Sequence, residues 1–203
     1  MNASIDVLTL FLFNIVLVNI PLLYGTVGEI VTEKAGSLNL GVEGTMAIGA
    51  IFGYLAGCMA NSLLVGLLVS FLAAGLCGAL FALLTVSLQA NQNVTGLTIT
   101  TFGPGLYLFV GQGLGSNWPA MQGSDSLVRG FTAIEIPLLS KIPVLGKVFF
   151  SHSILVYLGV IIAVAVWFYL SRTRLGLRVR AVGENPAAAD SVGVNILLYK
   201  YVH

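Results

Sequence analysis

The side chains best suited to bind another molecule lie in two polar stretches, residues 29–43 and 89–98, which are set between long apolar runs. Within them we predict that five side chains line a pathway: Asn39, Glu43, Asn93, Thr95 and Thr98. Most of these groups are amides and hydroxyls, which exchange hydrogen bonds with a solute that carries no charge. They predict binding and passage of a neutral polar solute. The structural alternatives are an interfacial loop at 29–43 and a polar cap on a kinked packing helix at 89–98.

The sequence pattern does not suggest an enzyme. A catalytic site needs a nucleophile beside a base, and a metal site needs clustered His, Cys, Asp or Glu at ligand spacing. His152 and His203 are isolated, and Cys58 and Cys77 lie in apolar runs without companion ligands. We therefore predict no catalytic residue, no metal site and no cofactor in this chain, with the cysteines acting as small packing residues.

The composition is that of an integral membrane protein. Hydrophobic residues make up 57% of the chain and charged residues 8%, against about 25% charged residues in soluble domains. The formal net charge is +1. Binding to nucleic acid needs a concentrated basic surface, so this charge argues against a nucleic-acid partner and leaves membrane lipid as the expected surroundings.

The apolar runs predict an all-α membrane protein, a polytopic bundle of about five transmembrane helices. Each crossing of the hydrocarbon core needs about 20 helical residues. We place the spans at about residues 7–28, 45–60, 62–88, 96–115 and 152–170. A single transmembrane domain then occupies 1–203, with an external loop at 116–151, in which 131–136 alternates like a short strand or interfacial ribbon.

Three features within this bundle concern packing and shape. Gly49, Gly53 and Gly57 recur every four residues, so they share one helical face where another backbone can approach closely. Residues 103–105 read Gly-Pro-Gly and are expected to interrupt the fourth span and free carbonyl groups. The stretch 29–43 is too polar for lipid, so we expect irregular backbone packed at the cytoplasmic side of the bundle.

The polar block 172–193 sets the orientation. It holds four of the nine basic residues: Arg172, Arg174, Arg178 and Arg180. By the positive-inside rule, residues 171–195 are cytoplasmic, and five crossings then put the N-terminus outside. Asn185 suits a helix N-cap, Pro186 the first helical position and Gly193 the end. We predict a short surface helix that docks on another protein.

Three blocks of the sequence, 33–44, 136–146 and 174–195, resemble the membrane permease subunits of bacterial ABC importers. That family includes the branched-chain amino-acid and ribose permeases. The similarity is greatest to the nucleoside type, which works with lipoprotein binding proteins. The resemblance covers nearly the whole chain, and the block 174–195 is its most specific part.

The resemblance implies a coupling helix that sits in a cleft of the ATP-binding subunit. In this chain that role falls on Gly183, Glu184, Asn185, Pro186, Ala187, Ala188, Ala189 and Asp190. The implied partners are an ATP-binding cassette subunit that uses ATP and Mg, a second permease subunit in a homodimer or heterodimer, and an extracytoplasmic solute-binding protein. The implied location is the bacterial cytoplasmic (inner) membrane.

The expected function is therefore uptake of a nucleoside or related neutral solute, as the permease subunit of an ABC importer. The sequence contains no Walker motif, so ATP hydrolysis is assigned to a separate subunit. No carboxylate lies at the centre of a predicted span. This favours transport driven by a separate subunit over transport coupled to an ion gradient. The alternatives are a branched-chain amino-acid or simple-sugar permease and a passive channel. Because family members are longer, we expect a fragment or a truncated product.

Overall fold

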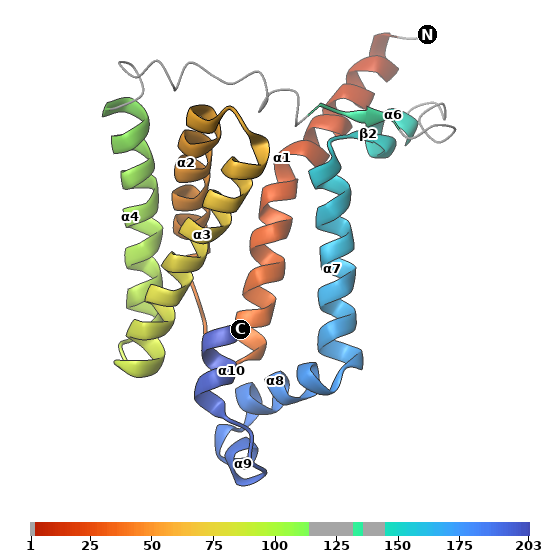
Figure 1. The fold of residues 1–203 in the computed structure, drawn as a ribbon. Coiled ribbons are helices and arrows are strands. Elements are labelled where there is room, and N and C mark those ends of the chain that lie inside the picture. Colours follow the sequence, from red (N-terminus) through yellow and green to blue (C-terminus); the bar gives the residue numbers. More distant parts are fainter. Residues whose placement is uncertain (1–2, 114–131, 136–144) are drawn as a thin grey trace.

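The computed structural model describes residues 3–113, 132–135 and 145–203. Long helices dominate this part of the chain and run side by side (Figure 1). They are α1 (Ala3–Lys34), α2 (Val42–Ala60), α3 (Leu63–Ala82), α4 (Gln92–Gly113) and α7 (Ile154–Arg172). Among the described residues, five helices are long and apolar enough to cross a membrane. The predicted fold class, an all-α polytopic membrane protein, is confirmed.

The helices form two packed groups. Helix α2 packs against α3 and α4, and α1 packs against α7, as Figure 1 shows. The first group buries Ile48, Cys77, Phe81 and Ile99 in one apolar cluster. Cys58 is also buried, and both cysteines are free thiols, in agreement with the packing role predicted for them.

The glycine face predicted on the second span is the contact between α2 and α3. A Cβ placed on Gly53 would lie 2.6 Å from Cβ of Ser70, and one on Gly49 would lie 3.2 Å from the Ser70 carbonyl oxygen. The distance at Gly53 is too short for a side chain, and the distance at Gly49 is barely sufficient. Glycine at these positions therefore permits the close helix approach that the four-residue spacing predicted.

The predicted interruption at residues 103–105 is wrong, because α4 continues as a helix through Pro104. The adjacent Gly103 serves packing instead: a Cβ there would overlap the backbone of Gly44 in α2. A proline costs a transmembrane helix little where neighbouring helices support the backbone. The irregular turn of this region lies earlier, where α3 ends in the π-helical turn η1 (Leu83–Ser87).

Small elements cover the end of the bundle near the start of α1 (Figure 1). Strand β1 (Ile134–Glu135) pairs antiparallel with β2 (Ser151–His152), directly after helix α6 (Leu145–Phe150). A strand was one of the two forms predicted for 131–136, and it is present over two residues. The rest of the predicted external loop, 114–131 and 136–144, lies outside the described residues, as does most of the block 136–146.

Three short helices occupy the opposite end, which we call the α9 end. They are α8 (Arg174–Glu184), α9 (Pro186–Ser191) and α10 (Ile196–Val202). Helix α8 crosses beneath α1 and α7, α9 projects farthest from the bundle, and α10 turns back toward α1 and α3 (Figure 1). The sequence predicted only the second of these helices. The arginine-rich stretch before it is also helical, with Gly176, Val179 and Val182 buried.

Candidate functional site

Helix α9 is a short exposed element with a complete N-terminal cap. The Asn185 Oδ1 atom accepts a hydrogen bond of 3.0 Å from the Ala188 backbone N–H, and Pro186 occupies the first turn. After the helix, Gly193 adopts φ +80°, the left-handed conformation typical of helix ends. The cap and end signals read from the sequence are confirmed at these three residues.

The eight predicted coupling residues divide into an outer and an inner set. The outer set is exposed and consists of Glu184, Asn185, Pro186, Ala187, Ala188 and Asp190. The inner set is Gly183, which is half-buried, and Ala189, which is 2% exposed. Docking is the role predicted for this stretch, so we call the six exposed residues the docking surface.

Helix α8 holds α9 firmly against the bundle. Val179 and Val182 are fully buried, and Val179 packs in a cluster with Ala35 and Leu170. At the corner between α7 and α8, the Thr173 hydroxyl donates to the Tyr169 carbonyl at 2.7 Å and accepts from the Gly176 N–H at 3.0 Å. Because α8 is fixed at its first residues and along its buried face, it gives α9 a firm support.

The connection between α1 and α2, residues 35–41, is a non-helical segment that enters the bundle, and we call it the polar segment. Side chains of other elements satisfy its backbone. The Leu38 N–H donates to Gln92 Oε1 at 2.8 Å, and the Asn39 N–H donates to Glu29 Oε1 at 2.8 Å. The Thr100 hydroxyl donates to the Leu40 carbonyl. Irregular backbone at membrane depth requires such partners.

Two of the five predicted pathway residues lie together beside the polar segment. Asn39 and Glu43 line a groove of about 290 Å³ that also includes Glu29 and Thr26. One carboxylate oxygen of Glu29, Oε2, is buried without a hydrogen-bond partner among the described residues. The groove can therefore accept hydrogen bonds from a polar molecule.

The other three predicted pathway residues lie on α4, away from this groove. The hydroxyls of Thr95 and Thr98 donate to the carbonyls of Asn91 and Val94, in the preceding turn of the same helix. Asn93 is exposed, and its backbone N–H donates to the Asn91 side chain. Asn93, Thr95 and Thr98 thus belong to the start of α4, and their place in a pathway stays a prediction.

Sequence reasoning did not assign a role to Glu29, Gln92 or Thr100. A signal existed for Glu29, since a carboxylate in the last turns of an apolar span is costly and usually has a specific partner. Gln92 and Thr100 gave no such signal, because their partners, a backbone N–H donor and a backbone carbonyl acceptor, are 54 and 60 residues away in the sequence. Only the fold brings them to the polar segment.

Metal binding finds no support in the described ranges. Within residues 3–113, 132–135 and 145–203, no group of three or more His, Cys, Asp or Glu side chains can hold a metal ion. Two candidate functional surfaces can be described in this chain: the exposed face of α9 and the hydrogen-bonding groups around the polar segment.

Comparison with known proteins identifies the family. Residues 11–203 match the family model described as "Branched-chain amino acid transport system / permease component". The chain belongs to this permease family. It is 35% identical over 97% of its length to the nucleoside ABC transporter permease NupC of Lactococcus lactis, and 36% identical over 90% to the guanosine ABC transporter permease NupQ of Bacillus subtilis. A putative glucose ABC transporter permease of Haloferax volcanii is 35% identical over 89% of the chain.

The relatives are longer than this permease-family chain, which spans 63%, 58% and 54% of the lengths of these three proteins. No solved structure matches the chain. The resemblance drawn from blocks 33–44, 136–146 and 174–195 is confirmed by the family match. Together with the helices described above, it makes the chain a multi-pass membrane protein of the permease family.

Proposed function

We propose that this chain, as a single transmembrane domain, is the permease subunit of an ATP-binding cassette importer that takes up a nucleoside or a related neutral polar solute. The observation that carries the proposal is the exposed, capped helix α9 on a firmly packed support. A permease driven by a separate ATPase needs a rigid element that protrudes from the membrane bundle and follows the movement of its partner. Helices α8 and α9 have this form.

The partner seated on α9 is an ATP-binding subunit, which supplies ATP hydrolysis with Mg. The outer face of α9 carries small side chains at Ala187 and Ala188, so a protein groove can approach it closely. Glu184 and Asp190 flank this face, so basic groups at the edges of the groove complement it. The permease itself performs no hydrolysis in this proposal.

In this proposal the α9 end lies in the cytoplasm, and the distribution of positive charge supports this orientation. Arg172, Arg174 and Arg178 are exposed at that end of the bundle, and short loops rich in arginine remain on the cytoplasmic side. The N-terminus and the β1–β2 ribbon then face outward in the bacterial inner membrane. A solute-binding protein delivers solute to that outer face, and a second permease subunit completes the pathway.

The solute class follows from the neutral hydrogen-bonding groups of the polar segment and from two relatives whose names specify nucleoside and guanosine. Amides and hydroxyls match the ribose and base of a nucleoside. A simple sugar and a branched-chain amino acid are less favoured, and they serve as competing solutes in the test.

Uptake into right-side-out membrane vesicles, with or without ATP inside, tests the proposal. The chain is co-produced with its neighbouring ATP-binding, permease and binding-protein subunits. We expect uptake of radiolabelled adenosine that requires ATP and is reduced by unlabelled guanosine, but not by leucine. If only glucose reduced uptake, the solute class would be a sugar and not a nucleoside. Adenosine flux that is indifferent to ATP would contradict the proposed mechanism.

A further inference from the structure

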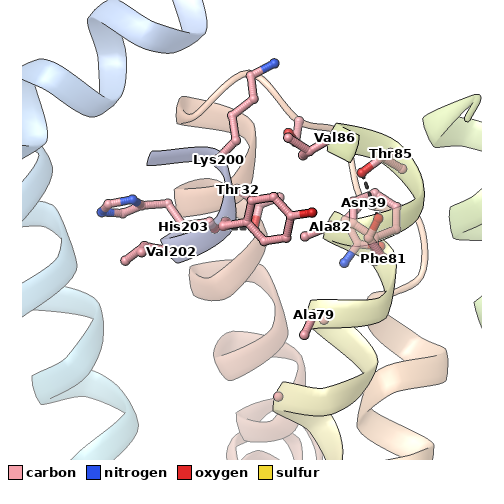
Figure 2. Close-up of a pocket in the computed structure, with 14 residues that line it drawn as sticks. Thr32, Asn39, Ala79, Phe81, Ala82, Thr85, Val86, Lys200, Val202 and His203 are labelled. Atoms are coloured by element: carbon pink, nitrogen blue, oxygen red, sulfur yellow. Dashed lines mark hydrogen bonds between the residues drawn. The ribbon is translucent and has the colours of Figure 1, made fainter. Parts of the chain in front are cut away.

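A second cavity lies on the other side of the polar segment from the groove at Glu43. It has a volume of about 250 Å³ and is bounded by α1, the polar segment, the end of α3 with η1, and α10. Figure 2 shows α3 on one side of it and α10 on the other. Sites for drug-sized ligands occupy about 300–1,000 Å³, so this cavity suits a small solute.

One wall of the cavity is smooth and offers unoccupied space. Gly75, Gly78 and Ala79 of α3 contribute to it, and a Cβ placed on Gly78 would find no atom within 4 Å. By contrast, Ser70 occupies the space next to Gly53 on α2, so no side chain fits there. Among the described residues, no neighbouring helix therefore packs directly on the glycine at 78. This glycine leaves a flat surface on which a ring can lie.

Two hydroxyl groups line the cavity, that of Ser37 from the polar segment and that of Thr85 from η1. Ser37 is only 5% exposed, and its Oγ atom has no hydrogen-bond partner among the described residues. Such a buried orphan costs free energy unless something pairs with it. The Thr85 hydroxyl donates to the Phe81 carbonyl at 2.8 Å, a bond drawn in Figure 2, and its oxygen can still accept. Ser37 and Thr85 line the same cavity.

The charge of the lining favours a neutral ligand. Among the described residues that form it, none is acidic, so a cation would find no counter-charge. Lys200 is at the edge, and its ammonium group points away from the other side chains drawn in Figure 2. An anion would therefore lack a direct contact inside. Uncharged hydroxyl and amide groups remain as the recognition chemistry.

We infer that this cavity is the solute-binding site of the permease, with Ser37 and Thr85 bonding the hydroxyls of a ribose-like ring that lies against Gly78. The inference rests on the proposed function and specifies where its solute binds. Ser37 follows Gly36, which contacts Gly183 of α8. A movement of α8 and α9 would therefore shift Gly36 and, with it, the neighbouring Ser37 hydroxyl. In this way the affinity of the site for its solute can change when α9 moves.

Equilibrium binding of tritiated adenosine to the purified chain in nanodiscs tests this inference without any partner subunit or ATP. Gly78→Leu fills the cavity, whereas Gly105→Leu is its matched control, because Gly105 is an exposed helical glycine that also has no atom within 4 Å of a Cβ. Thr85→Val has a similar control in Thr101→Val, since both hydroxyls donate to a carbonyl of the preceding turn.

We expect Gly78→Leu to abolish binding and Gly105→Leu and Thr101→Val to bind like the unaltered chain. Ser37→Ala and Thr85→Val are each expected to weaken binding about three- to tenfold, the usual effect of one uncharged hydrogen bond. Ser37→Ala should also not lower thermal stability, because it removes a buried hydroxyl that has no partner among the described residues. Absence of adenosine binding by the unaltered chain, or unchanged binding by Gly78→Leu, would overturn the site. Failed uptake with intact binding would overturn only the transport proposal.

Discussion

The backbones of Gly36 and Gly183 are in direct contact, since a Cβ on Gly36 would lie 2.9 Å from the Cα of Gly183. Gly36 begins the polar segment with φ +82°, and Gly183 lies in the last turn of α8, next to the docking surface. No side chain separates the two. This contact joins the docking surface, which we propose for an ATP-binding subunit, to the polar segment inside the bundle.

Replacing Gly36 with alanine tests that connection. We expect ATP-dependent uptake to fall at least about tenfold, a typical coupling effect between sites, because the new methyl group pushes α8 away. The matched control is Gly193→Ala, which has the same positive φ but no atom within 4 Å of a Cβ. Its backbone strain costs about 1–2 kcal/mol. Equal losses of uptake in the two variants would show that strain, and not the contact, is responsible.

Charge reversal at Glu184 tests docking. Glu184→Lys should leave the amount of folded protein unchanged, because Glu184 is exposed. It should lower uptake about tenfold while the ATP-binding subunit still hydrolyses ATP, since the reversed charge opposes its partner. Both activities are measured in the same vesicles. Lys147→Glu is the control, a change of charge of the same size and opposite sign at an exposed residue of α6, at the other end of the bundle. Normal coupling in Glu184→Lys would contradict the docking assignment.

The hydrogen bond from the Asn39 N–H to Glu29 should stabilise the polar segment. Glu29→Ala leaves that partly buried N–H unpaired, so we expect a loss of about 1 kcal/mol of unfolding free energy. Glu29→Gln keeps an oxygen in place and should lose less. Thermal unfolding in detergent measures both variants. Glu33→Ala, one turn later on α1 and exposed, is the control, and destabilisation equal to that of Glu29→Ala would argue against the specific bond.

The contact between α2 and α3 predicts a large effect of a side chain at Gly53. Gly53→Val would force atoms against Ser70 and the Gly66 carbonyl oxygen, which lie 2.6 Å and 2.9 Å from an added Cβ. Overpacking of this kind costs about 1–3 kcal/mol. Gly28→Val on α1 meets no atom within 4 Å and should be tolerated. The midpoints of thermal unfolding compare the two, and equal shifts would mean that helix propensity dominates.

Local signals were sufficient to predict the elements whose cause is local. The cap of α9 depends on Asn185, Pro186 and Gly193, which are neighbours in sequence, and the five helices follow from runs of apolar residues. The face made by Gly49 and Gly53 was also visible, because helical periodicity is a local property. These predictions needed no knowledge of how the helices are arranged.

The remaining features depend on contacts between distant residues. The continuity of α4 through Pro104 is one of them. Residues 103–105 suggest a helix break by type, but Gly103 packs against α2 and the helix continues. The partners of the polar segment are another, because Gln92 and Thr100 are brought to it only by the packing of α4. Of the predicted pathway residues, Asn39 and Glu43 share a groove, while Thr95 and Thr98 use their hydroxyls within α4.

The most direct test of the account is whether α9 touches an ATP-binding subunit. A photo-crosslinking amino acid at Ala188, an exposed position on α9, is irradiated in membranes that contain the neighbouring subunits. We expect a covalent product with the ATP-binding subunit from position 188, and none when the same photo-crosslinking amino acid replaces Lys147 on α6. The reverse pattern, or a product at neither position while ATP-dependent uptake continues, would contradict the proposal that α9 couples this permease to ATP hydrolysis.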